Sequence, residues 1–156
     1  MTDPVLIRQP HAHEADYLSD MVLRSKASWG YLPDFMAACV DVLRITPEDI
    51  AEGAIRVAAD AVTDTPLGLN KVVCDGGARA GLDKLFIAPE AMGRGVGALL
   101  FQDAATRAKA LGATVMTIDS DPGAESFYLR MGAARVGSVE SEAIPGRFLP
   151  KLEFTL

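Results

Sequence analysis

Apolar residues change their spacing several times along the chain, and each change marks a predicted element. Recurrence every three or four positions predicts helices over residues 13–26, 32–43 and 96–111. Short apolar or alternating runs predict strands over residues 5–8, 54–59, 67–73, 82–87, 114–120, 135–139 and 148–155. Shorter helices are expected over residues 47–52 and 124–131. This mixture of strands and helices predicts an α/β (α+β) fold.

Turn and cap residues support these boundaries. Thr46 followed by Pro47 is a typical helix start, with a capping side chain before a proline at the first helical position. Gly112 follows the last apolar position of the long helix, where a glycine commonly ends the helical conformation. The sequence DGG at residues 75–77 predicts a tight hairpin between two strands.

The connection between the strand at residues 82–87 and the next helix is rich in glycine. Gly93, Gly95 and Gly97 lie at the start of that helix, where backbone N–H groups lack partners and the helix dipole is positive. Glycine lets the backbone curl around a phosphate, and Arg94 adds a positive charge. The segment therefore predicts an anion site suited to a pyrophosphate.

Residues 93–98, GRGVGA, match the dinucleotide pattern G-x-G-x-x-G/A by letter. That pattern requires the strand to run directly into the first glycine. Here residues 88–92 intervene, and Pro89 is among them. A nucleotide-binding oxidoreductase is therefore the least supported function.

The segment instead resembles motif A of the GNAT superfamily, the acyl-CoA-dependent N-acyltransferases. That motif reads Q/R-x-x-G-x-G/A after a strand and opens a helix. Gly95 and Gly97 match it, and Leu99 and Leu100 follow as in the family. Met92 stands at the first position, where the family prefers Gln or Arg.

Residues 121–133 resemble a later segment of the same family. Ala124, Tyr128 and Gly132 have the family's offsets from Asp121, which replaces the usual Asn, and Ala133 replaces a Phe. Two motifs in the family's order are much more specific than one. We therefore expect a single GNAT-like N-acetyltransferase domain over residues 1–156.

The resemblance implies a mixed, mostly antiparallel sheet of about seven strands flanked by helices and splayed between its fourth and fifth strands. It implies transfer of an acetyl group from acetyl-CoA to a primary amine by direct attack, without a metal. One backbone N–H of Phe86 or Ile87 would meet the thioester oxygen. The residues expected at the cofactor are Phe86, Ile87, Met92, Gly93, Arg94, Gly95, Val96, Gly97, Ala98, Asp121 and Phe127.

Tyr128 and Asp83 are the expected catalytic residues. A phenol in reach of the sulfur can protonate the departing thiolate, and the family commonly has its general acid at this position. The alternative for Tyr128 is simple packing beside Phe127. Asp83 lies on the strand that carries the splay and is the preferred base. Glu52, Glu90, Glu125 or an ordered water are the alternatives.

The acceptor pocket is expected near Trp29 and Tyr31, whose rings can face an amine by cation–π contact. An aromatic plug in the core is the alternative for these two side chains. Glu142, in the loop at residues 140–147, could meet a cationic amine, although a solvated loop explains it equally well. The acceptor itself is expected to be a small-molecule or peptide amine.

Charge and composition limit the other partners. A net charge of −6 and a pI near 4.8 argue against nucleic acid, which needs clustered Lys and Arg. No apolar run approaches the roughly 20 residues that span a bilayer, and the first residues do not resemble a signal peptide, so we expect a cytoplasmic protein without membrane contact. The family is compatible with a homodimer.

A non-catalytic acyl-CoA-binding or sensing module is the competing hypothesis. Met92 and Asp121 support it, because both depart from the family's motifs. An inward-pointing Asp121 would also repel a phosphate-rich cofactor.

Overall fold

A seven-stranded sheet organises residues 4–156, the part of the chain that this computed structural model describes. Its strands are β1 (Val5–Arg8), β2 (Ile55–Asp60), β3 (Pro66–Cys74), β4 (Arg79–Ile87), β5 (Val115–Asp119), β6 (Ala134–Glu140) and β7 (Phe148–Thr155). Their order across the sheet is β1-β2-β3-β4-β5-β7-β6. Within the described residues, neighbouring strands are antiparallel except β4 and β5, which are parallel.

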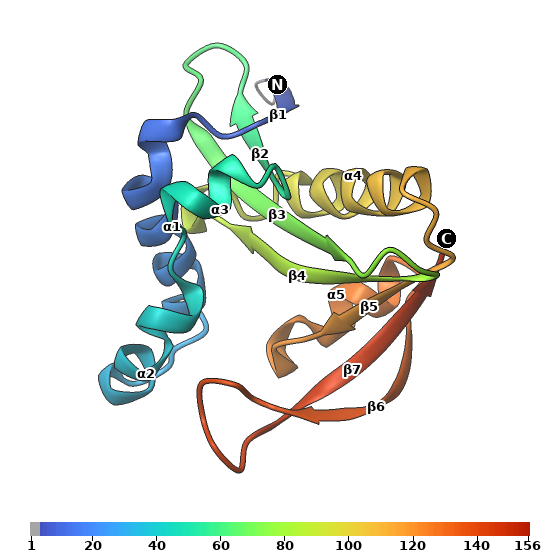
Figure 1. Ribbon diagram of the computed structural model, residues 1–156. Helices are drawn as coiled ribbons and strands as arrows, with labels where there is room; N and C mark the ends of the chain where they lie inside the picture. The colour runs from blue at the N-terminus through green and yellow to red at the C-terminus, as the bar shows by residue number, and fades with distance from the viewer. Residues whose placement is uncertain (1–3) are drawn as a thin grey trace.

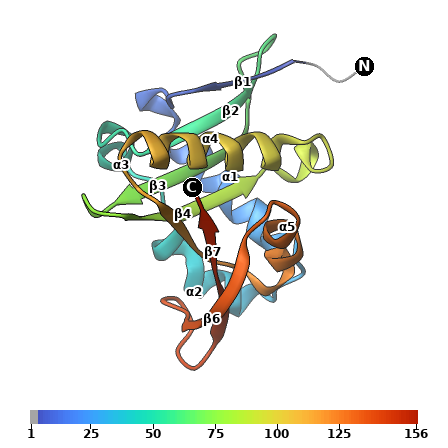
Figure 2. The same ribbon diagram turned by 90° about the vertical axis from the view of Figure 1, so that its right-hand side faces the viewer.

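Helices cover both faces of this sheet (Figures 1 and 2). They are α1 (Ala15–Ala27), α2 (Pro33–Leu43), α3 (Pro47–Ala51), α4 (Val96–Ala110) and α5 (Glu125–Arg130). Single 3₁₀ turns precede three of them: η1 (Ala12–Glu14), η2 (Pro89–Ala91) and η3 (Pro122–Ala124). Figure 2 shows α4 across one face of the sheet, with α1 on the opposite face. None of the helices in residues 4–156 has the length and apolarity needed to cross a bilayer.

The predicted order of strands and helices is confirmed, with small shifts at the boundaries. Strand β4 begins at Arg79, earlier than the predicted start at Leu82, because its hairpin with β3 continues through Gly81 and Ala80. Thr46 caps α3 as expected, since its side chain accepts a hydrogen bond from the N–H of Asp49.

The expected splay between the fourth and fifth strands is also confirmed. Strand β5 pairs with β4 only as far as Leu82, opposite Ile118, although β4 continues to Ile87. The register with β3 shifts at the same place: Val72 is opposite Leu82, and Lys71 is opposite Lys84. Asp83 is therefore the extra residue of a β-bulge, which bends a strand and increases its twist. The bulge accounts for the separation of β4 from β5 (Figure 1).

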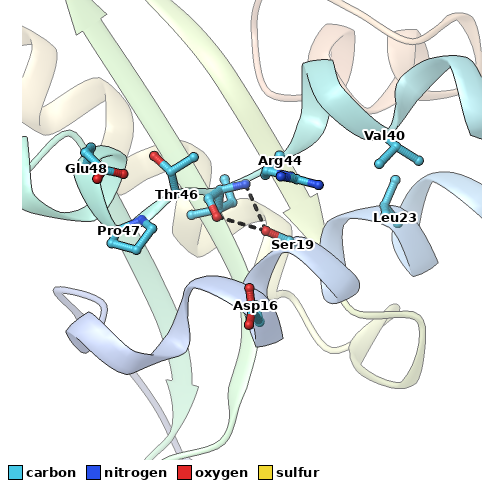
Figure 3. Close-up of a pocket in the computed structure, with 9 residues that line it drawn as sticks. Asp16, Ser19, Leu23, Val40, Arg44, Thr46, Pro47 and Glu48 are labelled. Atoms are coloured by element: carbon cyan, nitrogen blue, oxygen red, sulfur yellow. Dashed lines mark hydrogen bonds between the residues drawn. The ribbon is translucent and has the colours of Figure 1, made fainter.

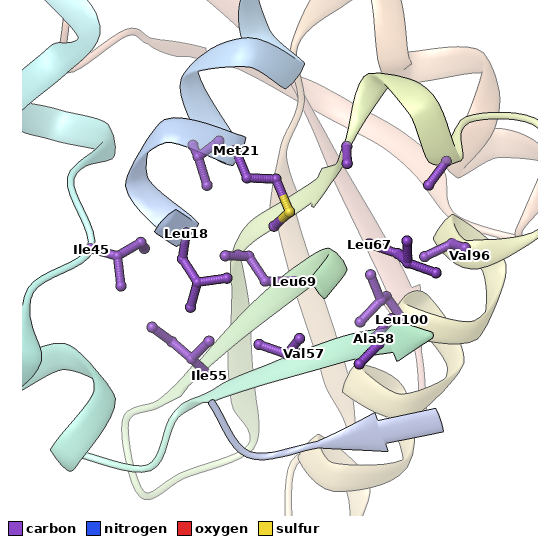
Figure 4. Close-up of a cluster of buried hydrophobic side chains, with 14 residues drawn as sticks. Leu18, Met21, Ile45, Ile55, Val57, Ala58, Leu67, Leu69, Val96 and Leu100 are labelled. Carbon is purple, nitrogen blue, oxygen red and sulfur yellow. The ribbon is translucent and has the colours of Figure 1, made fainter. Parts of the chain in front are cut away.

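Two clusters of buried apolar side chains lie on the two halves of the divided sheet. The first joins α1, β2, β3 and the beginning of α4 (Figure 4). The second joins the rest of α4 to β5, α5 and β7. Helix α4 belongs to both, with Val96 and Leu100 in the first cluster and Phe101, Ala104 and Ala108 in the second. Its position is thus fixed by both halves of the molecule.

Strand β3 holds α4 through a glycine and a buried amide. A Cβ added to Gly68 would lie 2.8 Å from the carbonyl oxygen of Phe86 and 2.9 Å from a methyl carbon of Leu100. The side chain of Asn70 is fully buried and donates hydrogen bonds to the Leu100 carbonyl at 2.8 Å and to Asp103 at 3.0 Å. These contacts set the height of the glycine-rich helix start above the sheet.

Gly68→Ala should destabilise the protein, because the new methyl group has no space between the sheet and α4. Overpacking of this kind costs about 1–3 kcal/mol. Gly137→Ala on β6 is the matched control, since a Cβ there meets nothing within 4 Å. Chemical denaturation of both variants tests the difference, and equal midpoints would contradict the close approach.

Candidate active site

A cavity of about 770 Å³ opens where β4 and β5 separate. Its walls come from the end of β4, the glycine turn, α5, the α1–α2 segment and the β6–β7 loop. The predicted site residues that line it are Trp29, Asp83, Phe86, Ile87, Met92, Gly93, Gly95, Gly97, Ala98, Asp121, Phe127, Tyr128 and Glu142. Segments far apart in the sequence thus meet at the divided edge of the sheet.

Three predicted residues do not line this cavity with the others. Val96 is 1% exposed and its side chain belongs to the first core cluster. Tyr31 lies beside the cavity and reaches Asp121 by hydrogen bond. The positive charge of Arg94 is felt by Asp60. The pKa of Asp60 is held below its usual range chiefly by hydrogen bonds from the N–H groups of Thr63 and Val62, and to a smaller extent by the Arg94 charge. A role for Arg94 beside a phosphate stays a prediction.

The glycine turn leaves a set of backbone donors open. Gly93 and Gly95 have φ angles of 81° and 79°, a left-handed conformation that other residues adopt at a cost. Within residues 4–156 the N–H groups of Val96, Gly97 and Ala98 have no hydrogen-bond partner. Together with the positive end of the α4 dipole, these donors form an arrangement that can hold a phosphate group.

The open edge of β4 presents backbone donors to the same cavity. Ala88 donates its N–H to the carbonyl of Leu67 on β3. Hydrogen-bonded and non-hydrogen-bonded pairs alternate in an antiparallel ladder, and Leu69–Phe86 is two positions further along the same register. The N–H of Phe86 therefore faces β3, whereas the N–H of Ile87 faces the side that β5 has left. Of the two predicted donors, Ile87 is therefore the one whose N–H is free, within the described residues, to bind a ligand.

Tyr128 on α5 extends from the second core cluster to the cavity. The residue is 6% exposed, with its ring centroid 6.1 Å from that of Phe101 and 5.2 Å from that of Phe127. Its hydroxyl makes no hydrogen bond to residues 4–156. In this part of the chain, every fully buried polar side-chain atom has a hydrogen-bond partner, so the Tyr128 oxygen is not one of the fully buried atoms. The hydroxyl is therefore not completely enclosed, and Tyr128 lines the cavity. Burial, and secondarily the charge of Asp121, raises the pKa of Tyr128, so the phenol keeps its proton at neutral pH.

Comparison with known protein families identifies this arrangement. The model of the acetyltransferase (GNAT) domain matches residues 46–144. The chain belongs to the GNAT family. The match runs from α3 through the glycine turn and Tyr128 into the β6–β7 loop, and so covers most of the cavity wall.

Solved structures confirm the GNAT fold. A GCN5-related N-acetyltransferase from Rhodopseudomonas palustris has a TM-score of 0.78 at 17% identity, covering 100% of this chain and 99% of that chain. The PaiA N-acetyltransferase from Thermoplasma acidophilum, solved with coenzyme A, has a TM-score of 0.76 at 15% identity over 98% and 99% of the two chains. N-acetylglutamate synthase from Neisseria gonorrhoeae, with coenzyme A and N-acetyl-glutamate, has a TM-score of 0.68 at 13% identity over 100% of this chain and 36% of that one. Comparison with curated proteins gives no match.

Asp121, which replaces the Asn of the GNAT motif, binds side chains from α1, the α1–α2 segment and the β6–β7 loop. Its Oδ2 accepts hydrogen bonds from Lys26 and Tyr31, both at 2.7 Å, and the Arg147 guanidinium lies 3.7 Å away. Its Oδ1 accepts the N–H of Gly123 at 2.9 Å. Burial alone would raise the pKa of Asp121, but these hydrogen bonds outweigh it and hold the pKa below its usual range. A direct contact between Asp121 and the cofactor stays a prediction.

The aromatic residues of the α1–α2 segment complete this wall. Tyr31 stacks on Phe35 with a centroid distance of 4.0 Å, and burial together with the hydrogen bond to Asp121 raises its pKa to about 12. Trp29 lies over the η3 turn, where a Cβ on Gly123 would be 2.9 Å from its ring. The hydroxyl of Tyr31 accepts a hydrogen bond from Arg147 at 2.8 Å. Lys26 and Arg147 thus belong to the site, although no spacing pattern in the sequence links them.

Two carboxylates lie at the end of the β4–β5 pairing. Asp83 and Asp119 directly follow the last paired residues, Leu82 and Ile118, and both line the cavity. Asp83 has Lys84 at 3.2 Å and Lys71 at 3.8 Å, whereas Asp119 has no ion pair within residues 4–156. The sequence prediction omitted Asp119, and the signal that could have found it is its position at the end of a predicted strand.

The alternative bases lie elsewhere. Glu90 pairs with Arg24 at 3.0 Å, and Glu125 pairs with Arg135 at 3.5 Å. Neither residue lines the cavity, and Glu52 does not line it either.

A second, smaller cavity of about 370 Å³ lies between α1, the end of α2 and α3, beside Ser19 and Arg44 (Figure 3). It contains no residue of either GNAT motif.

Asp121→Asn should destabilise the protein although Asn is the family's residue, because Lys26 and Arg147 would lose their anion. We expect a loss of about 1–3 kcal/mol at pH 7. A depressed carboxyl pKa stabilises the folded state above the unfolded pKa, and this contribution disappears as pH falls below about 4. The difference between wild type and variant should therefore shrink in acid. Asp119→Asn is the control and should have little effect on unfolding at either pH.

Proposed function

We propose that this protein is an N-acetyltransferase that transfers the acetyl group of acetyl-CoA to a primary amine by direct attack. The observation that carries the proposal is the meeting of three features in one cavity: the glycine turn, the open edge of β4 and the Tyr128 hydroxyl. The two neighbours solved with coenzyme A support the choice of cofactor.

The glycine turn would hold the pyrophosphate through the N–H groups of Val96, Gly97 and Ala98. Their combined positive field offsets the charge of the phosphates without a metal ion. The pantetheine arm would then lie along the open edge of β4 and pair with its backbone as an added strand does. Both interactions use backbone groups, so the departure at Met92 from the family's Gln or Arg removes little binding.

The Ile87 N–H would stabilise the negative charge that develops on the thioester oxygen when the amine attacks its carbonyl carbon. Such preorganised donors are usually the largest single contribution to acyl-transfer catalysis. The C–N bond forms, the C–S bond breaks, and Tyr128 gives its proton to the departing thiolate. The phenol has a proton to give at neutral pH, but burial raises its pKa and makes it a weaker acid, so the role depends on the hydroxyl being held beside the sulfur.

The amine would approach from the side of Asp83 and Asp119. An ammonium ion must lose a proton before it attacks, and a carboxylate or a water held by one can accept it. Asp83 remains our candidate base, and Asp119 joins it because no cation neutralises Asp119 within the described residues. Glu142 in the β6–β7 loop would add to the negative charge that the amine meets.

Incubation with acetyl-CoA and a panel of amines, with detection of free thiol and of the acetylated product, tests the proposal. A folded protein that binds acetyl-CoA but acetylates no amine would instead support an acyl-CoA-binding or sensing module. The next two predictions test the cofactor site and the chemical step separately.

Gly97→Val should weaken acetyl-CoA binding by at least about tenfold, or 1.4 kcal/mol. Gly97 lines the cavity, and its Cβ would lie 3.4 Å from the Phe127 ring, so a larger side chain fills the space over the turn. Gln102→Val places the same side chain on the exposed face of α4 and is the control. Calorimetric titration measures both, and unchanged affinity in a folded Gly97→Val variant would remove the turn from the binding site.

Tyr128→Phe should lower turnover by roughly 10²-fold while acetyl-CoA affinity stays nearly constant, the scale expected for loss of a positioned acid. Stability should change little, because the hydroxyl has no hydrogen bond to residues 4–156. Tyr17→Phe on the exposed face of α1 is the control. Steady-state rates and melting temperatures decide the matter, and full turnover in Tyr128→Phe would refute the acid role.

A further inference from the structure

The acceptor side of the cavity carries a cluster of four hydrogen-bonded side chains: Lys26, Tyr31, Asp121 and Arg147. Lys26 and Arg147 line the cavity, and their side chains are only 12% and 20% exposed. The guanidinium carbon of Arg147 lies 4.9 Å from the ring centroid of Phe35, which holds its plane in place. Three separate segments of the chain thus bring two cations to one wall.

Lys26 and Arg147 keep N–H donors that bind neither Asp121 nor Tyr31. Its carboxylate already accepts from Lys26, Tyr31 and the N–H of Gly123, and the single proton of Tyr31 is given to it. Arg147 has five N–H donors and uses one of them, toward the Tyr31 hydroxyl; Lys26 uses one of three. With two cations and one carboxylate, the cluster has a net positive charge at neutral pH.

Carboxylates lie close to this positive wall. Asp119 is two residues before Asp121, so their Cα atoms are at most about 7 Å apart. Asp119 and Asp83 line the same cavity at the end of the β4–β5 pairing. The acceptor side is therefore bipolar: at the split of the sheet the carboxylate of Asp119 has no ion pair within residues 4–156, and unused cationic donors lie beside it.

We propose that the acceptor of this enzyme carries a carboxylate close to its primary amine, as an amino acid does, and that Arg147, assisted by Lys26, binds that carboxylate. The planar guanidinium offers the paired N–H groups that a carboxylate accepts in a bidentate manner. The ammonium end of the same molecule then faces Asp119 and Asp83. This inference rests on the proposed N-acetyltransferase function and names its acceptor class.

The test compares acceptors that differ only in the carboxylate. The common L-amino acids, their amides and the corresponding decarboxylated amines are assayed with acetyl-CoA, and binding of each amino acid to the protein with CoA is measured by calorimetry. We expect kcat/KM for the best amino acid to exceed that of its amide and its amine by at least about tenfold, the factor that corresponds to 1.4 kcal/mol. Equal or higher activity with the amide or amine overturns the proposal.

Variants of Arg147 assign the effect to this side chain. Arg147→Gln should raise KM for the amino acid at least about tenfold with kcat nearly unchanged, while the amide and acetyl-CoA keep their KM values. Arg147→Lys should recover part of the loss, since it restores the charge without the planar fork. Arg44→Gln, beside the smaller cavity, removes the same charge and should change none of these constants. A higher KM for acetyl-CoA in Arg147→Gln would assign Arg147 to the cofactor and overturn the proposal.

The two measurements separate this inference from the proposed function. Amine acetylation without any preference for a carboxylate leaves the N-acetyltransferase proposal intact and refutes the acceptor class. Amino acids that bind with CoA, lose binding in Arg147→Gln, and are not acetylated refute the enzyme but support the carboxylate subsite. Absence of both binding and turnover for every amino acid refutes the subsite.

Discussion

The end of hydrogen bonding between β4 and β5 at Leu82 is the constraint on which the site depends. Backbone donors and acceptors inside a protein need partners, and a strand that loses its neighbour in mid-sheet offers them to another chain or to a ligand. The bulge at Asp83 bends β4 at that point, and the remaining four residues of the strand, 84–87, form the open edge. One local irregularity therefore creates both the cavity and a row of backbone groups suited to an extended ligand.

Helix α4 holds the two halves of the divided sheet in a fixed position relative to each other. Its first residues belong to the same buried cluster as Leu69 and Val57, and its middle belongs to the cluster of Met116 and Leu152, so the helix takes part in both cores. Gly68 and Asn70 fix it to β3 from below. The start of the helix, where we propose the anion site, is thus held rigidly against the same strand whose edge is open. Precise separation between a phosphate site and a reactive thioester would follow directly from this rigid connection.

Local chemistry in the sequence was sufficient for the elements, and most of the site residues that it predicted line the cavity. The glycines of the turn, the cap at Thr46 and the offset of Tyr128 each act within a few residues, so their consequences can be read without a structure. The cluster around Asp121 could not be predicted in this way. Lys26 and Arg147 reach it from positions 95 and 26 residues away, and only the folded chain brings them together. The same holds for the choice between Phe86 and Ile87, because it depends on which strand each N–H faces.

Residue-resolved amide protection by NMR tests the central claim most directly, because the claim concerns single backbone N–H groups on β4. Addition of acetyl-CoA should slow hydrogen exchange at Ile87, and at Leu85 on the same side of the strand, along with the donors at residues 96–98. The N–H of Phe86, which already faces β3, should change little. Protection that is confined to the glycine turn, or equal at Phe86 and Ile87, would contradict the binding of the acyl-thioester along the open edge of β4.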